Sequence, residues 1–251
     1  LKGLERNPGR LDEVLEAMAG ADAVIWCTPV YFLLVPAQLK RFLELILDHA
    51  DASSLRGKPC TTVTTSAHFY DHTAHDYLAG ISSDLGMAYV QGFSADQMDL
   101  LSGERRRSLV AFAQDFFQRT ADGLPSFPAV RPVRWQAPTY HEAPLPEDAP
   151  TTIGGRLTLV TDEGPDDRNL RRMTRAFERA VRLPVRRLAL EELSMDGGCL
   201  GCMHCVDGAP CRYRDDYAEA YDRLVTPADV VIYAGAVRDR YLSSRLKTFQ
   251  D

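Results

Sequence analysis

Residues 21–42 read ADAVIWCTPVYFLLVPAQLKRF, and this stretch decides the fold. Residues 23–26 are a short apolar run that contains Val and Ile, which is typical of a buried parallel strand. The pair Thr28-Pro29 is predicted to end the strand, because proline has no N–H for a central ladder. A helix is predicted from near Pro36, with apolar side chains at helical spacing: Leu39, Phe42, Leu43 and Ile46. Strand, tight loop and helix form half of a βαβ unit, and ligands bind at the carboxyl ends of such strands.

The same stretch recurs later in the chain. Residues 228–249 read ADVVIYAGAVRDRYLSSRLKTF and align without a gap at an offset of 228 − 21 = 207. Eight positions are identical: Ala21/Ala228, Asp22/Asp229, Val24/Val231, Ile25/Ile232, Val30/Val237, Leu39/Leu246, Lys40/Lys247 and Phe42/Phe249. Because the identities lie in register across both strand and helix, we interpret the chain as containing a duplicated domain.

Composition bounds the classes of function. The chain has 251 residues, room for one large domain or two of ordinary size. Its hydrophobic fraction of 45% and charged fraction of 25% are typical of soluble globular proteins. A net charge of −6 argues against a nucleic-acid partner, and no apolar run approaches the roughly 18 residues of a membrane span. The chain opens on Leu1 inside a predicted helix, so we expect the native N-terminus to lie upstream.

Strand and helix patterns alternate along the chain. Residues 1–122 are predicted to be the C-terminal part of a first domain, with helices near 11–18, 76–85 and 109–116 and strands at 23–26, 61–65 and 88–93. Residues 156–251 are predicted to be the N-terminal part of a second domain, with strands at 156–160, 185–190 and from 228. Such alternation predicts parallel sheets with right-handed crossovers.

The segment 123–155 differs in composition from both flanks. It holds seven of the fifteen prolines, at positions 125, 128, 132, 138, 144, 146 and 150. Proline-rich segments favour extended geometry, so a semi-rigid linker is predicted. The alternative is an ordered arm that packs across a domain face.

The run Thr28-Pro29-Val30-Tyr31-Phe32, with Gln38-Leu-Lys-Arg-Phe42 after it, resembles the flavin-contacting segment of the NADPH-dependent FMN reductase group of flavodoxin-like proteins. The resemblance covers most of residues 10–120. It implies an α/β fold, a flavodoxin-like doubly wound parallel sheet, here as two partial copies. It also implies that loop N–H groups hydrogen-bond the flavin ring edge, while Tyr31 and Phe32 offer stacking faces. Residues 33–35, Leu-Leu-Val, depart from the small residues usual in the family.

In this family the loop after the following strand also borders the flavin. Here that loop is Ser66-Ala67-His68-Phe69-Tyr70, and the resemblance implies Ser66, Ala67 and His68 as further cofactor-binding residues. The same loop region holds three histidines and two aspartates that could form a metal site: His68, His72, His75, Asp71 and Asp76. We favour a solvated or flavin-edge loop over that alternative.

The second copy departs from the family where the FMN phosphate is normally bound, in a turn after the first strand. Here residues 161–169 read TDEGPDDRN. Four carboxylates, Asp162, Glu163, Asp166 and Asp167, would repel a phosphate, and we expect them to cap the next helix instead. We interpret the second copy as one that does not bind FMN.

Four cysteines gather in the second copy. Cys199, Cys202, Cys205 and Cys211 have the spacing Cys-x2-Cys-x2-Cys-x5-Cys, which the iron–sulfur flavoprotein branch of the family uses to hold a [4Fe–4S] cluster. Four thiolates suit such a cluster or zinc, and reduced structural thiols are the third alternative. The clustering favours a reducing compartment, so we expect a cytoplasmic protein.

The resemblance implies an NAD(P)H-dependent flavin (FMN) oxidoreductase. FMN would accept hydride from NAD(P)H and pass it to a small-molecule or redox-protein substrate. The alternatives are an iron–sulfur flavoprotein electron carrier and a degenerate flavodoxin-like scaffold without a cofactor. No nucleic-acid or membrane partner is expected, and a homodimer is compatible with the resemblance.

The strand order 2-1-3-4-5 of flavodoxin-like sheets has a consequence for two partial copies. The first copy would supply strands 3, 4 and 5, and the second would supply strands 1, 2 and 3. Each partial sheet exposes an edge that invites pairing. We favour strand 157–160 pairing beside strand 24–26 in a permuted single sheet over two partial sheets packed face to face.

Overall fold

The structure is a computed structural model that describes residues 2–48, 52–67, 69–123, 130–131, 138–144, 154–181 and 183–251. The chain divides into two compact units. The first unit comprises residues 1–134 with Asp239–Tyr241 and Asp251, and the second comprises residues 135–238 with Leu242–Gln250. Each unit is described by itself.

A parallel sheet forms the centre of the first unit. Its strands are β1 (Val24–Pro29), β2 (Pro59–Ser66), β3 (Ala88–Tyr89) and β4 (Phe93–Asp96). Strand β2 pairs with β1 on one side and with both β3 and β4 on the other, always in parallel. The predicted alternation of strands and helices around a parallel sheet is confirmed, and β1 lies at one end of the strand order.

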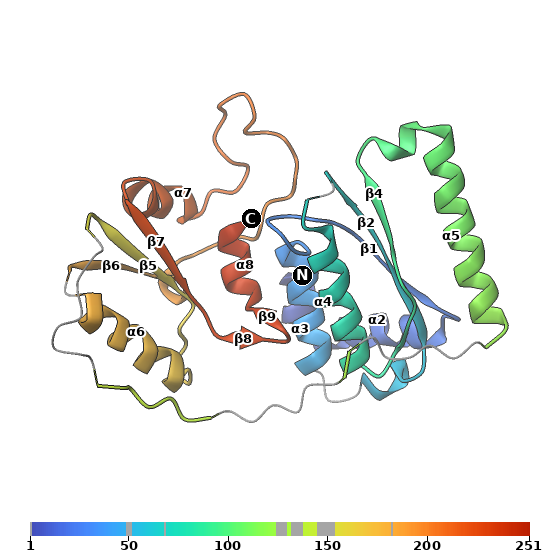
Figure 1. The fold of residues 1–251 in the computed structure, drawn as a ribbon, viewed down its shortest axis with the longest axis horizontal. Coiled ribbons are helices and arrows are strands. Elements are labelled where there is room, and N and C mark those ends of the chain that lie inside the picture. Colours follow the sequence, from blue (N-terminus) through green and yellow to red (C-terminus); the bar gives the residue numbers. More distant parts are fainter. Residues whose placement is uncertain are drawn as a thin grey trace. The chain divides into compact units, whose positions relative to one another are not determined.

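Helices flank this sheet. They are α1 (Lys2–Arg6), α2 (Pro8–Gly20), α3 (Ala37–Asp48), η1 (Ala52–Leu55), α4 (Asp71–Asp84), η2 (Asp99–Leu101) and α5 (Gly103–Ala121). In Figure 1, α3 and α4 lie on one side of the strands and α5 on the other. Leu43, Ile46, Leu78 and Ile81 of α3 and α4 are completely buried in the core. None of the helices within the described residues is both long enough and apolar enough to cross a bilayer.

Strand β1 continues through Thr28 and Pro29, which the sequence predicted to break it. Pro29 pairs with Thr65 of β2 in the parallel register. Within the described sheet, β1 pairs with β2 alone, so the missing N–H of the proline removes no bond on its outer edge. The strand therefore ends three residues later than the predicted 23–26.

The predicted strand 88–93 is divided in two by a bulge. Cys60 pairs with Tyr89 and Val63 pairs with Phe93, so three residues of this strand oppose two residues of β2. The hydroxyl of Thr61 donates to the carbonyls of the bulged residues Val90 (3.0 Å) and Gln91 (3.3 Å). The extra residue of the bulge shifts the pairing register with β2 by one residue, and β4 continues to Asp96.

A second parallel sheet forms the second unit, in the order β6-β5-β7. Its elements are β5 (Leu157–Thr161), α6 (Arg168–Val181), β6 (Val185–Ala189), η3 (Leu190–Glu192), α7 (Tyr217–Ala220), the π-helical η4 (Tyr221–Val225), β7 (Val230–Ala234), β8 (Val237–Arg238), β9 (Tyr241–Leu242) and α8 (Ser244–Gln250). This order matches strands 2-1-3 of the predicted doubly wound sheet. The permuted single sheet is wrong, because β5 is paired on both sides, by β6 and by β7.

The core of the second unit gathers around Phe249 in α8. Its ring lies 5.3 Å from that of Tyr217, 6.2 Å from that of Tyr221 and 6.5 Å from that of Tyr233. Val160 of β5 belongs to the same buried cluster. The apolar face of the repeated helix therefore buries its aromatic residue, as its spacing predicts.

The repeated stretches share an unusual turn. In the first, Phe32 and Leu33 have φ of 36° and 69°, and in the second Asp239 and Arg240 have φ of 47° and 68°. These pairs are equivalent at the offset of 207 residues. Consecutive left-handed residues without glycine are uncommon, so the shared conformation supports the interpretation of a repeat.

Part of the proline-rich segment is described. In residues 138–144, the N–H of Tyr140 donates to Asn169 Oδ1 (2.8 Å), and Glu142 forms an ion pair with Arg179 of α6. Such contacts are those of an ordered arm. Residues 124–129, 132–137 and 145–153 lie outside the described residues, and so does most of the predicted linker.

Candidate functional site

Two loops predicted to border a flavin meet at the carboxyl ends of β1 and β2. The N–H of Val30 donates to the carbonyl of Thr65 (3.0 Å). The hydroxyl of Thr73, in the first turn of α4, contacts the carbonyls of Leu33 and Tyr70. These bonds hold the loop after β1 against the loop after β2, because parallel strands end at the same edge of a sheet.

The loop after β1 closes as a tight turn. Tyr31 and Leu34 exchange two backbone hydrogen bonds, of 2.8 and 3.1 Å. The N–H groups of Val30 and Tyr31 are therefore already used. Within the described part of the chain, the N–H groups of Phe32 and Leu33 make no backbone hydrogen bond. Among residues 30–34, Phe32 and Leu33 are therefore the ones whose N–H groups have no backbone partner in the described structure.

Exposed aromatic side chains surround the meeting point of the loops. Phe32 is 53% exposed, Phe69 64% and Tyr70 43%. The Phe69 and Tyr70 rings are 4.7 Å apart, and Tyr70 stacks on His72 at 5.5 Å. Phe69 and Tyr70 belong to the loop that the family resemblance implies beside the flavin, and their role there stays a prediction.

The other predicted site residues have different surroundings. The side chain of Thr28 is buried and donates to the carbonyl of Pro29 (2.9 Å), so it shapes the loop. Ser66 ends β2, and its carbonyl accepts the N–H of Gln97 (3.0 Å). Ala67 is exposed beside it. His68 lies outside the described residues.

A cavity of about 580 Å³ opens between α4 and the edge segment β3–β4. Helix α4 begins at Asp71, five residues before the predicted start, and this first part of the helix lines the cavity. The bulged strand supplies Tyr89, Gln91 and Ser94 to the opposite wall. The sequence predicts a loop over residues 66–75, so the helical placement of Asp71–His75 and the cavity beside them were not expected.

A chain of hydrogen bonds crosses one end of the cavity. His75 Nε2 lies 2.9 Å from the hydroxyl of Thr64 in β2. That hydroxyl donates to Ser94 Oγ (3.3 Å), and Ser94 Oγ donates to the carboxylate of Asp71. Burial lowers the pKa of His75, although Asp71 and Asp76 act in the opposite direction. The net effect favours the neutral imidazole.

The bulge makes room for His75. A Cβ at Gly92 would lie 2.4 Å from the carbonyl oxygen of Thr62 and 2.7 Å from His75 Nδ1. Only glycine allows this approach of strand, sheet and imidazole. Tyr89 is buried beside the bulge, and burial raises the pKa of its phenol.

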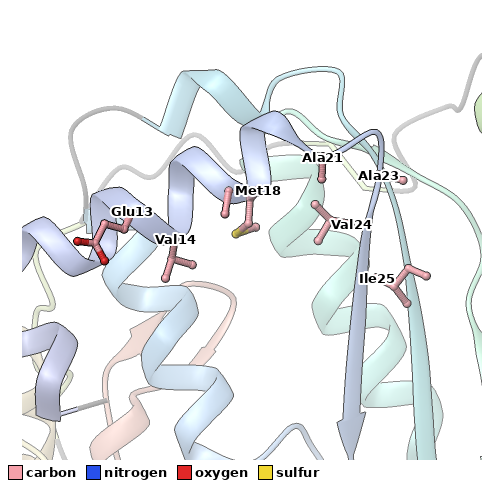
Figure 2. Close-up of a pocket in the computed structure, with 8 residues that line it drawn as sticks. Glu13, Val14, Met18, Ala21, Ala23, Val24 and Ile25 are labelled. Carbon is pink, nitrogen blue, oxygen red and sulfur yellow. The ribbon is translucent and has the colours of Figure 1, made fainter.

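A second hollow, of about 450 Å³, runs along α2 and the open edge of β1 (Figure 2). Its lining is apolar apart from Glu13, and includes Val14 and Met18 of α2 and Val24 and Ile25 of β1. It offers neither the hydrogen-bonding groups nor the charge that a catalytic centre needs.

In the second unit, the acidic turn after β5 is occupied by its own side chains. Glu163 accepts from Arg171 Nε (2.8 Å) and from Arg187 (2.5 Å), and Thr174 donates to it at 3.2 Å. Burial would raise the pKa of Glu163, but these partners outweigh burial and hold the pKa below its ordinary value.

The expectation that all four carboxylates cap α6 is wrong for at least two of them. Glu163 pairs with arginines, and Asp162 accepts a hydrogen bond from the hydroxyl of Ser243. Asp167 bonds within the turn, to the N–H of Gly164 (2.9 Å). The guanidinium partners are Arg171 in the first turn of α6 and Arg187 in β6, which follows that helix in the sequence.

The predicted cysteine cluster lies in a loop of the second unit. Cys199, Cys202, Cys205 and Cys211 are exposed and, like the other two described cysteines, form no disulfide. Within the described residues, no group of three or more His, Cys, Asp or Glu side chains is arranged to hold a metal ion. The four-thiolate site therefore stays a prediction.

Part of the first unit matches a known protein family. Residues 2–98 match the NADPH-dependent FMN reductase family. The match spans β1, the turn after it, α3, β2, the loop after β2 and α4, and ends in the segment after β4. The resemblance drawn from Thr28–Phe32 and Gln38–Phe42 is thereby confirmed for this part of the chain.

Solved structures that resemble part of this chain include flavin proteins. A general stress protein 14 from Treponema denticola in complex with FMN is 16% identical, with a TM-score of 0.34 over 45% of this chain and 72% of that one. An NADPH-quinone reductase from P. pentosaceus is 18% identical, with a TM-score of 0.35 over 41% and 72%. An FMN-dependent NADH-azoreductase from Bacillus anthracis in complex with FMN is 15% identical, with a TM-score of 0.35 over 49% and 65%. No curated protein matches this chain.

Proposed function

We propose that this protein is an NAD(P)H-dependent FMN oxidoreductase and that its flavin binds to the first unit. The observation that carries the proposal is the family match over residues 2–98, which contains both loops that meet at the ends of β1 and β2. FMN, when bound, supplies the hydride chemistry, and the protein supplies position and environment.

The residues at the loops suit a flavin ring. The N–H groups of Phe32 and Leu33 are suited to donate to the polar edge of the ring, since neither has a backbone partner in the described structure. The exposed faces of Phe32 and Tyr70 are suited to stack on it. Phe32 and Leu33, which carry these N–H donors, are the two consecutive left-handed residues of the turn.

We further propose that the second unit does not hold an FMN phosphate. Arg171 and Arg187, the arginines with which a bound phosphate would pair, already form ion pairs with Glu163. A phosphate entering the turn would also meet Asp162, Asp166 and Asp167. The second unit is thus proposed to support the reductase without a flavin of its own.

Titration of FMN with the whole chain tests the flavin proposal. FMN fluorescence should be quenched on binding, and NADPH added to the complex should bleach the flavin absorbance without oxygen. Phe32→Ala should weaken binding by about 1–2 kcal/mol, a loss of roughly 5–30-fold. The matched control is Phe117→Ala, which removes a 55% exposed phenylalanine from α5. Equal affinity of the two variants would contradict the assignment of the turn.

The family points to small-molecule substrates. A homodimer and a cytoplasmic location are parts of the proposal that rest on the family resemblance and the clustered cysteines. Light scattering of the whole chain measures its oligomeric state. A mass of one chain at micromolar concentration would contradict the homodimer.

A further inference from the structure

The cavity between α4 and the bulged strand has one polar wall made by a helix. His72, His75, Asp76 and Ala79 follow the spacing i, i+3, i+4, i+7 and so share one face of α4, the α4 stripe. A helix face beside a sheet is ordinarily apolar. The first three residues of this stripe are polar, and His72 and Asp76 are exposed.

The hydrogen-bond chain fixes which groups this wall offers. Each hydroxyl has one hydrogen, and those of Ser94 and Thr64 are given to Asp71 and to Ser94 respectively. His75 Nε2 must then donate to Thr64. The neutral ring consequently carries its hydrogen on Nε2, and Nδ1, beside Gly92, is left as an acceptor.

The charge of the lining and the volume of the cavity indicate which class of ligand it can hold. The nine lining residues include two carboxylates, Asp71 and Asp76, and neither lysine nor arginine. Asp71 lies in the first turn of α4, where it offsets the positive end of the helix dipole. The volume of about 580 Å³ lies within the usual range of small-ligand sites. The lining is negatively charged and richer in acceptors than in donors.

We propose that this cavity binds a small organic cation that carries several N–H donors, of the ammonium or guanidinium class. The carboxylate of Asp76, the amide oxygen of Gln91 and His75 Nδ1 are the acceptors that recognise it. Tyr89, which lines the same cavity, adds an aromatic ring. The proposal does not depend on flavin binding, because no residue of the turn after β1 lines the cavity.

Protonation of His75 opposes the cation. The imidazole faces Asp71 and Asp76 from its own helix, Tyr89 from β3 and Thr64 from β2. A bound cation neutralises the two carboxylates that favour the imidazolium, and it repels the imidazolium directly. Binding of the cation and of the proton are therefore mutually unfavourable.

Agmatine, which has an ammonium and a guanidinium group, is the probe, and calorimetry with the whole chain measures its affinity. We expect saturable binding at pH 7.5 that weakens as the pH falls below 6.5 toward the folded pKa of His75, and no binding of uncharged 1,4-butanediol. Asp76→Asn should weaken the binding of agmatine at least fivefold. Asp115→Asn, which removes the same charge from the exposed face of α5, should not.

Gln91→Leu is a second variant, which removes one acceptor without a change of charge. It should also weaken the binding of agmatine. Nuclear magnetic resonance of His75 should show its pKa falling further when agmatine is bound. Absence of saturable binding, equal loss in Asp76→Asn and Asp115→Asn, or competition by butanediol would overturn the proposal. Displacement of agmatine by stoichiometric Zn²⁺ would overturn it in favour of a metal site.

Discussion

His75 Nε2 lies 2.9 Å from the hydroxyl of Thr64, and this contact joins helix α4 to strand β2. The two residues are eleven positions apart, but a loop and the first turn of a helix separate them. The contact holds an imidazole against the sheet where Gly92 of the bulge leaves space for it. The position of α4 and the protonation of His75 are therefore linked.

This linkage predicts a pH dependence of stability. Because the pKa of His75 is lower in the folded protein than its ordinary value of 6.5, the unfolded chain binds the proton more readily. The contribution of His75 is complete above about pH 6.5 and is lost as the pH falls through that value toward the folded pKa. Urea unfolding from pH 7.5 to pH 5.5 should show a falling free energy of unfolding. The fall should be smaller in His75→Gln, and an equal fall would contradict the assignment.

Gly92→Ala should destabilise the first unit. Its Cβ would overlap the Thr62 carbonyl and His75 Nδ1, and overpacking of this kind costs about 1–3 kcal/mol. Gly20→Ala is the control, because its Cβ would meet no atom within 4 Å at the end of α2. The control should be neutral or slightly stabilising. Thermal unfolding compares the two variants, and equal midpoints would show that the bulge is not as close to His75 as described.

A buried ion pair in α3 gives a third prediction. Lys40 is completely buried, with Nζ 3.0 Å from Glu44 Oε1 and 5.4 Å from the ring centre of Tyr77. Lys40→Met leaves the buried Glu44 carboxylate with Arg41 as its remaining basic neighbour in the helix, at 3.4 Å. We expect a loss of about 3 kcal/mol by urea unfolding.

Replacing both members of the pair should cost less than replacing the lysine alone, because the Glu44 carboxylate is then not left buried without Lys40. The double variant Lys40→Met with Glu44→Leu is the comparison. A double variant that is as unstable as the single one would contradict the importance of the pair.

The turn after β1 gives a fourth prediction. Replacing Thr28 by Leu removes the hydroxyl that donates to the carbonyl of Pro29 and overfills a buried site. FMN affinity should fall together with the order of the turn, as fluorescence titration measures. Circular dichroism establishes whether the fold survives, and unchanged affinity in a folded variant would remove this loop from the site.

The four clustered cysteines give a fifth prediction. If they hold a [4Fe–4S] cluster, anaerobic reconstitution of the whole protein should bind about four iron and four sulfide. Cys202→Ala should reduce that content, whereas Cys27→Ala, an exposed cysteine of β1, should not. Zinc without iron would favour the alternative of a structural zinc site. Neither metal would leave the cysteines as reduced thiols.

Several features of this protein follow from sequence patterns alone. The largely apolar runs at 23–26 and 157–160 and the β-branched run Thr-Thr-Val-Thr-Thr at 61–65 predict strands of a parallel sheet, because such short runs pack well on a buried pleated surface. Proline in the run Thr28–Phe32 marks the loop and the family. Even so, Pro29 remains inside β1, because the consequence of a missing N–H depends on whether the strand has a neighbour there.

Other features were decided by tertiary structure, because they depend on residues that are distant in sequence. Strand β5 pairs with β6 and β7 and so cannot also pair with β1, which no local pattern could decide. Glu163 finds Arg187 on a neighbouring strand and does not cap a helix. The sequence by itself determined the order of strands and helices and the loop at the end of β1. Only the packing of α4 on a bulged edge strand brought Asp71, His75 and Ser94 around one cavity, since hydrogen-bond partners are chosen by distance in space.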